Sequence, residues 1–228
     1  MTFGFLFVAV LAIKCVFGIN GIDAAGSVIS VTDYECLKKD GYTFMITRAW
    51  ESLGHFDPDA PQNLRNAQAA GYPVSNTSVY FFPCASTSQS AKAQMQTMIQ
   101  SLDEAKVEYN MIWLDIEENP SSGCSWSKNS INTNCDIILA AGNTAVAANK
   151  TVGIYSNYNE WTEYIFFGDS GACAEPAKSG WPLWYADYDY AQNFNDFERF
   201  GGWTKPVMKQ YAGDRTVCGK DVDLNWAP

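Results

Sequence analysis

Histidine is almost missing from this sequence of 228 residues, in which His55 is the only example. Hydrolases with a serine or cysteine nucleophile usually rely on an imidazole base, and His55 follows a glycine in an expected loop. We therefore expect a structural role for His55. No two cysteines have the Cys-x-x-Cys spacing of a zinc site, and one histidine is too few to complete a set of zinc ligands. The sequence thus predicts neither a metal nor a cofactor.

Low-complexity segments, internal repeats and proline- or glycine-rich linkers are also missing, so one domain is the simplest description. The apolar run from Thr2 to Gly18 predicts a signal peptide, residues 1–18, with small residues at positions −3 and −1 of its cleavage site. The run is near the lower limit for a membrane span, and Lys14 interrupts it, so we expect no membrane anchor. The domain then covers residues 19–228, and the protein is expected to be secreted or delivered to a lysosomal or phagosomal compartment.

Seven cysteines become six if Cys15 leaves with the signal peptide. An even number of cysteines in an exported chain suggests three disulfides, whose pairing the sequence leaves largely open. Proximity favours only Cys124–Cys135, on either side of a loop rich in serine and asparagine. The other four cysteines are Cys36, Cys84, Cys173 and Cys218.

Basic residues are few, 15 against 25 acidic ones, and the formal net charge is −10 at pH 7. Nucleic acid is therefore an unfavourable partner. Any other anionic polymer would also be repelled at neutral pH, and less so in an acidic compartment where carboxylates are protonated. The alternative is that the acidity only keeps an exported protein soluble.

Segments rich in β-branched and aromatic residues predict eight strands. They are Ile19–Asp23, Tyr42–Arg48, Ser78–Phe82, Tyr109–Glu117, Thr151–Ser156, Leu183–Asp187, Val207–Tyr211 and Asp221–Leu224. Helical patterns lie between the first five: Asp33–Lys39, Pro61–Ala70 after a capping Asp59, Ala91–Val107 and Cys135–Ala148. After Ser156 only Glu160–Phe166 has a helical pattern. The alternation predicts an α/β barrel that becomes irregular in its final third, with its chemistry at the carboxyl ends of the strands.

The most informative segment is 111–118, because two acids end the most apolar strand of the chain. Side chains alternate along a strand, so Trp113, Asp115 and Glu117 point into the barrel or its mouth. Crowding of two carboxyl groups beside a tryptophan raises the pKa of one of them, so a protonated acid and an anion coexist. Glycosidic cleavage requires such a pair. A solvated strand end with incidental acids is the alternative. The residues expected to face the helices are Ile112, Leu114 and Ile116.

Acids end or follow other predicted strands as well, and the barrel geometry brings them to one rim. They are Asp23, Glu51, Asp187 and Asp223, with Arg48 beside Glu51. Asp187 and its neighbour Asp189 are equally well explained as loop or helix-capping acids. Aromatic residues accompany the acids and suit stacking on sugar rings, although each also suits a core. These are Tyr80, Phe82, Trp113, Tyr155, Trp184, Tyr185, Tyr211 and Trp226.

With these motifs in order, the chain resembles glycoside hydrolase family 25, the lysozymes first known from moulds and phages, and particularly its cysteine-bearing amoeba and nematode branch. The similar segments span nearly all of residues 19–228: 21–23, 44–51, 114–117, 153–156, 183–186, 210–211 and 222–225. One departure is Trp50-Glu51-Ser52, where the family often has Thr-Glu-Gly, so Glu51 is set in a different local sequence.

The resemblance implies an irregular TIM-like barrel of five β/α units followed by three strands. It implies a monomeric muramidase that hydrolyses the β-1,4 bond between N-acetylmuramic acid and N-acetylglucosamine in peptidoglycan. Glu117 resembles the general acid, Glu51 resembles a supporting acid, and three acids resemble those around the reacting sugar: Asp23, Asp115 and Asp223. Expected substrate contacts are Glu51, Tyr80, Phe82, Tyr155, Trp184, Tyr185, Gln210 and Tyr211.

Two mechanisms remain open from the residues. In one, Asp115 orients the 2-acetamido group for attack on the anomeric carbon; in the other, a second carboxylate activates water. Two other functions are also open. A secreted carbohydrate-binding or immune-signalling protein could use the same barrel without chemistry, and a chitinase would carry a longer Asp-x-x-Asp-x-Asp-x-Glu run, which the apolar residues before Asp115 do not match.

Overall fold

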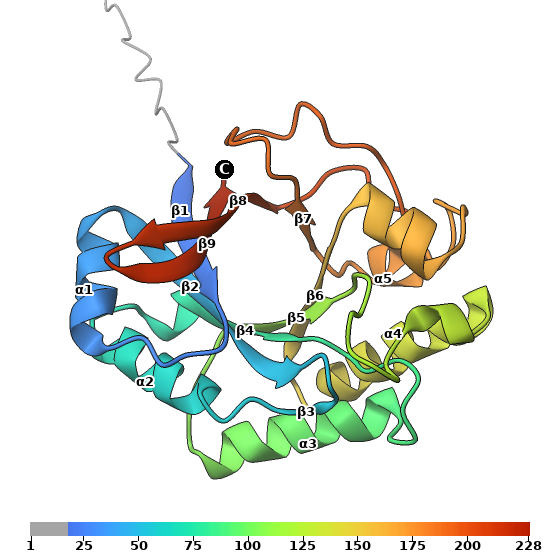
Figure 1. The fold of residues 1–228 in the computed structure, drawn as a ribbon, viewed down its shortest axis with the longest axis horizontal. Helices are drawn as coiled ribbons and strands as arrows, with labels where there is room; N and C mark the ends of the chain where they lie inside the picture. The colour runs from blue at the N-terminus through green and yellow to red at the C-terminus, as the bar shows by residue number, and fades with distance from the viewer. Residues whose placement is uncertain (1–17) are drawn as a thin grey trace, which may run out of the picture.

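Eight strands close into a barrel in the computed structural model, which describes residues 18–228 (Figure 1). The barrel strands are β1 (Ile19–Ala24), β2 (Tyr42–Glu51), β4 (Thr77–Phe81), β5 (Met111–Asp115), β6 (Thr151–Ser156), β7 (Leu183–Ala186), β8 (Met208–Val217) and β9 (Lys220–Ala227). Each corresponds to a predicted strand. A short strand β3 (His55–Phe56), which the sequence did not predict, pairs with β2. Residues 1–17 of the predicted signal peptide, residues 1–18, lie outside the described residues.

The order of the strands confirms five β/α units followed by three strands. From β1 through β8 each neighbouring pair is parallel, and β9 closes the ring by pairing antiparallel with both β8 and β1. Parallel neighbours place their carboxyl ends at one mouth of the barrel. The final hairpin of β8 and β9 is longer than predicted and lies beside β1, with its turn toward α1 (Figure 1).

Helices cover the outside of the barrel in the order predicted for the first four units. They are α1 (Val31–Lys39), α2 (Ala60–Ala69), α3 (Ala91–Glu104) and α4 (Ile131–Ala147), followed by a π-helix η3 (Glu160–Ile165) and a short α5 (Glu175–Lys178) that the sequence did not predict. Two 3-10 turns are η1 (Val74–Asn76) and η2 (Trp126–Lys128). None of the described helices is long and apolar enough to cross a membrane.

Side-chain hydrogen bonds at the N-cap residue fix where two of the helices begin. Ser30 caps α1 through a capping box with Asp33, and Ser130 caps α4, which begins four residues before the predicted Cys135. Asp59 is the N-cap residue of α2, as predicted, but its side chain makes no capping hydrogen bond there. The Asp59 N–H donates to Asp57 Oδ1 at 3.0 Å.

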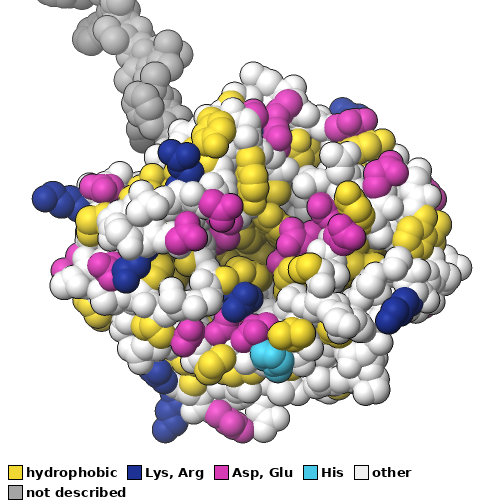
Figure 2. Space-filling model, viewed as in Figure 1, with side chains coloured by type: hydrophobic (Ala, Val, Ile, Leu, Met, Phe, Trp, Pro, Cys, Tyr) yellow, Lys and Arg dark blue, Asp and Glu magenta, His cyan; other side chains and the backbone are white. Residues whose placement is uncertain are grey.

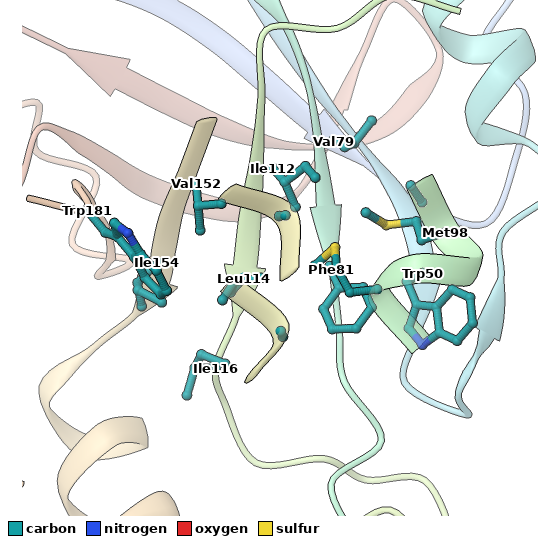
Figure 3. Packing of buried hydrophobic residues seen from close by; sticks show 14 of the residues in the cluster. Trp50, Val79, Phe81, Met98, Ile112, Leu114, Ile116, Val152, Ile154 and Trp181 are labelled. Atoms are coloured by element: carbon teal, nitrogen blue, oxygen red, sulfur yellow. The ribbon is translucent and has the colours of Figure 1, made fainter. Parts of the chain in front are cut away.

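Two apolar layers result from the alternation along the strands. The larger layer lies between the barrel and the helices and includes Leu114, Ile154 and Phe81, all fully buried (Figure 3). The smaller one fills the barrel, where Trp113 and Trp184 meet edge to face with ring centroids 5.7 Å apart. These layers hold the strand ends, and thus their polar side chains, in fixed positions.

Three disulfides confirm the predicted number but correct the one predicted pairing. The bonds are Cys36–Cys218, Cys84–Cys124 and Cys135–Cys173. Cys124–Cys135 is wrong because Cys124 lies in the loop after β5, next to the loop after β4 that carries Cys84. Cys135 lies one turn into α4, facing the segment after η3. Cys124 therefore pairs with the cysteine of a neighbouring loop, and Cys135, on α4, pairs with Cys173, although Cys124 and Cys135 are closer in sequence.

Candidate active site

Four carboxyl groups meet in one small pocket at the mouth of the barrel. Asp23 is the last but one residue of β1, Asp115 ends β5, Glu117 follows two residues later, and Asp223 lies on β9. The pocket has a volume of about 130 Å³ and is also lined by Tyr80, Tyr155, Trp184, Tyr188 and Gln210. Figure 2 shows acidic side chains gathered around a hollow in the middle of this face, with hydrophobic side chains inside it.

Asp23 and Asp223 face each other directly across the antiparallel pair of β1 and β9. Gln210 bridges them, because its Nε2 donates to Asp23 Oδ2 at 2.8 Å and to Asp223 Oδ2 at 3.1 Å. Burial and then the charge of Asp223 raise the pKa of Asp23 to about 7, although hydrogen bonds from Asn225 and Gln210 oppose the rise. Burial also raises the pKa of Asp223. The pair therefore holds a proton more readily than ordinary aspartates.

The amide of Gln210 is oriented by two tyrosines. The hydroxyls of Tyr155 and Tyr188 donate to its Oε1 at 2.6 and 2.9 Å, which leaves the Nε2 group to face the acids. Asn225 adds a donor to Asp23 Oδ2 at 2.7 Å, while its own oxygen accepts from Trp184 Nε1 at 2.8 Å. Residues from four strands thus fix one carboxyl group, which is the kind of preorganisation that catalysis requires.

Asp115 is buried, with 6% of its surface exposed, and its Oδ1 atom has no hydrogen-bond partner within the described part of the chain. Burial raises the pKa of Asp115 well above its usual range, and the charges of Glu117 and Asp23 raise it further. An unpaired acceptor in a pocket of this size can receive a polar N–H or O–H group from a ligand.

Glu117 lies beyond the end of β5, and its backbone is held from outside the strand. Trp126 Nε1 donates to the Glu117 carbonyl oxygen at 2.9 Å. Burial raises the pKa of Glu117 to about 7, with further increases from the charges of Glu160, Asp23 and Asp223. Glu117 therefore keeps its proton in mildly acidic solution, beside carboxyl groups whose pKa values are raised by burial as well.

A wider groove of about 380 Å³ adjoins the pocket and shares Glu117, Tyr155 and Tyr188 with it. Tyr185 and Asp187 line this groove, together with Glu160 from η3. The predicted contact residues are thus divided between two spaces. Tyr80, Tyr155, Trp184 and Gln210 line the pocket, and Tyr185 lines the groove.

Three predicted contact residues lie outside both spaces. Glu51 is close to His55, with 3.6 Å between Oε1 and Nδ1, and Phe82 and Tyr211 are buried away from the pocket. Asp187 and Asp189 have a structural partner, because both contact the fully buried Lys209 Nζ, at 3.5 and 2.8 Å. The acids on this side of the rim therefore neutralise a buried ammonium group.

Sequence reasoning missed Tyr188, Glu160 and Asn225 as members of the site. Asn225 could have been found, since it follows Asp223 by two residues on the same strand face. Tyr188 lies in an irregular loop, and Glu160 marked the start of a helical pattern, so neither gave a signal of its own.

A family described as lysozyme-like protein 1 matches residues 18–211 of the chain. Probable GH family 25 lysozyme 2 from Dictyostelium discoideum is 38% identical over 216 residues, which covers 95% of this chain and 94% of the relative. Lysozyme-like protein 5 from Caenorhabditis elegans is 34% identical over 211 residues, which covers 92% of this chain and 91% of the relative.

The fold also matches solved structures. The bacterial lysozyme from Streptomyces coelicolor superimposes with a TM-score of 0.71 at 23% identity, covering 92% of both chains. At this level of identity the likeness concerns the barrel itself, and it agrees with the five β/α units and three strands described above.

Proposed function

The chain belongs to the glycoside hydrolase family 25 lysozymes, which are glycosidases, and we propose on this basis that it is a muramidase acting on bacterial peptidoglycan. It hydrolyses the β-1,4 bond between N-acetylmuramic acid and N-acetylglucosamine. Glu117 is the general acid, and the remaining acids of the pocket surround the reacting sugar: Asp23, Asp115 and Asp223.

The observation that carries this proposal is a proton donor surrounded by other carboxyl groups in one pocket. The pKa of Glu117, raised to about 7 by burial and by nearby acids, leaves this group protonated at mildly acidic pH. Departure of a sugar hydroxyl requires a proton on its oxygen, while positive charge develops on the ring that remains. Glu117 supplies the proton, and a neighbouring carboxyl group that ionises as the positive charge develops stabilises that charge.

The free Oδ1 atom of Asp115 supports an orienting role for this residue. It can accept the N–H of a 2-acetamido group, which turns the acetamido oxygen towards the anomeric carbon. In the alternative route a second carboxylate draws a proton from water, whose oxygen then bonds to the anomeric carbon. In both routes the glycosidic C–O bond breaks and Glu117 protonates the leaving oxygen.

We propose that the protein acts outside the cytosol, either secreted or in a lysosomal or phagosomal compartment. Three disulfides support this location, because such bonds persist in oxidising compartments. The exposed side chain of Asn149, in the sequence Asn149-Lys150-Thr151, is a compatible glycosylation acceptor. An acidic compartment also suits a protonated Glu117.

The experiment that tests the proposal compares Glu117→Gln with Glu118→Gln on purified peptidoglycan. Gln keeps the size of Glu but delivers no proton, so Glu117→Gln lowers turnover at least about 10²-fold. Glu118 is exposed, one residue along, and its variant stays within about twofold of wild type. Mass spectrometry of the products identifies a muramidase by muramic acid at the new reducing end.

Circular dichroism establishes that both variants are folded. If the protein only binds carbohydrate, neither wild type nor either variant releases product. Normal turnover by Glu117→Gln would mean that another residue is the general acid. Loss of turnover in Glu118→Gln alone would contradict the orientation of this segment.

A further inference from the structure

The segment that carries Glu117 lies beyond β5, which ends at Asp115. Four hydrogen bonds to other elements hold it. The Ile116 N–H donates to the Tyr155 carbonyl of β6 at 2.9 Å, and Ser156 Oγ donates to the Ile116 carbonyl at 2.7 Å. Trp126 Nε1 donates to the Glu117 carbonyl at 2.9 Å, and the Glu118 N–H donates to the Glu160 carboxylate at 2.6 Å.

Glu160 is the charged member of this set. It is the first residue of the π-helix η3, and its own N–H donates to Asn157 Oδ1 at 2.8 Å, which fixes the start of the helix after β6. Its side chain is partly buried and lines the same groove as Glu117. One carboxylate is therefore anchored to the peptide that follows Glu117 and also lies beside the Glu117 side chain.

We propose that Glu160 is a positioning residue for Glu117: it fixes the turn after β5 and places a negative charge beside the Glu117 carboxyl. The inference rests on the proposed role of Glu117 as the acid. An ionised Glu160 makes ionisation of Glu117 less favourable, so it widens the pH range over which Glu117 keeps its proton. Burial raises the pKa of Glu160 itself, and the hydrogen bond from the Glu118 N–H opposes that rise by stabilising the carboxylate. Among the neighbouring charges, that of Glu160 has the largest effect in raising the pKa of Glu117.

Other groups around Glu117 define the electrostatic background against which Glu160 acts. Around the pocket they are Asp23 on β1, Tyr80 on β4, Asp115 on β5, Tyr155 on β6, Tyr188 after β7 and Asp223 on β9, with Arg48 on β2 near Asp115 and Glu118 beside Glu160. Along the groove that Glu117 and Glu160 share they are Tyr158, Tyr185, Asp187, Asp196 and Glu198. These residues are the same in every Glu160 variant, but the charge of Glu160 also raises the pKa of Asp115, so the titration of Glu117 has to be followed at its own carboxyl group.

Three variants separate the two roles of Glu160. Glu160→Gln keeps an oxygen that accepts from the Glu118 N–H but removes the charge. Glu160→Ala removes both. Glu163→Gln is the matched control, because Glu163 lies on the same helix, carries the same charge, and is exposed outside the groove.

The first measurement is the pH dependence of kcat/KM on peptidoglycan. We expect Glu160→Gln to move the alkaline limb to lower pH by at least about half a unit, with activity near pH 5 within about twofold of wild type. Glu160→Ala lowers kcat at every pH by up to about tenfold, because it removes the hydrogen bond that holds the peptide after Glu117. Glu163→Gln leaves both quantities unchanged.

The second measurement does not depend on activity. The carboxyl carbon of Glu117 is followed by NMR in ¹³C-glutamate-labelled protein, with the resonance assigned by its loss in Glu117→Gln. We expect its midpoint to fall in Glu160→Gln and to stay in place in Glu163→Gln. An unchanged midpoint in folded Glu160→Gln overturns the inference. If the midpoint falls but Glu117→Gln remains fully active, the proposed function fails while the contact of the two acids stands.

Discussion

The two faces of β5 carry side chains of opposite character. One face presents Leu114, fully buried, to the helices that surround the barrel (Figure 3). The other presents Asp115, also buried, to a pocket of carboxyl groups. Burial of an aliphatic side chain stabilises the fold, whereas burial of an acid raises its pKa and destabilises the ionised form.

This contrast shows how the barrel stabilises a site in which the burial of ionised acids is unfavourable. The layer around Leu114 anchors the strand, and the strand holds Asp115 at a place where its carboxyl group would not otherwise lie. The acids are consequently available for chemistry because packing on the opposite face determines their position. Substitutions on the two faces should therefore have opposite signatures: loss of activity with stability kept, or loss of stability with activity kept.

The largest effect is expected on the acid face, from Asp115→Asn. Asn has the same size, but it cannot become an anion when positive charge develops on the substrate. We expect kcat on peptidoglycan to fall roughly 10²- to 10³-fold, with a thermal unfolding midpoint at or above that of wild type. Steady-state kinetics and thermal unfolding at pH 5 measure both quantities. An active Asp115→Asn variant, or one that is inactive only because it unfolds, would erase the contrast between the two faces.

Much of this contrast could be predicted from the sequence, because it depends on alternation along one strand. Ile112 and Leu114 face the helices and Trp113 and Asp115 face inward, as their spacing indicates. Glu117 reaches the same pocket although β5 ends before it. The eight strands and the change of pattern after Ser156 were also predictable from the apolar and helical patterns, whereas the division into five β/α units and three strands followed from the family resemblance.

Other parts of the site depend on contacts between segments far apart in the sequence. Gln210 is held by Tyr188 from an irregular loop, and no periodic pattern marks that tyrosine. The pairing of Cys124 with Cys84 follows from two neighbouring loops at the barrel mouth. The hairpin of β8 and β9 extends past its apolar residues because backbone hydrogen bonds between its strands do not require an apolar pattern.

A smaller effect, on stability, is expected from the helix-facing side of β5. Leu114→Ala leaves a cavity in the layer between the barrel and the helices, so we expect it to lower the free energy of unfolding by about 3 kcal/mol. Turnover by the folded fraction at 25 °C stays within about twofold of wild type. Denaturant unfolding beside kinetics measures the two. The matched control is Leu53→Ala, since Leu53 is 57% exposed and loses little on truncation. Equal destabilisation by both variants would contradict the packing described for β5.

The smallest effect is expected in the pH dependence of stability, and it has a definite sign. The pKa of Glu117 is raised from 4.5 to about 7 in the folded protein, so between these values the folded state binds more protons than the unfolded state. Unfolding therefore becomes easier as pH rises through this window, and the destabilisation is absent below it.

Replacement of Glu117 with Gln removes this ionisation. We expect Glu117→Gln to match wild type in stability at pH 4 and to exceed it by roughly 1 to 3 kcal/mol at pH 8, since the other acids of the pocket share part of the effect. Urea unfolding from pH 4 to pH 8 gives the difference directly, and Glu118→Gln, exposed one residue along, should show no such trend. A difference between Glu117→Gln and wild type that is constant with pH would mean that Glu117 titrates alike in the folded and unfolded states. Burial of Glu117 beside the acid face of β5 would then not destabilise its ionised form, and the raised pKa on which the general-acid role depends would be absent.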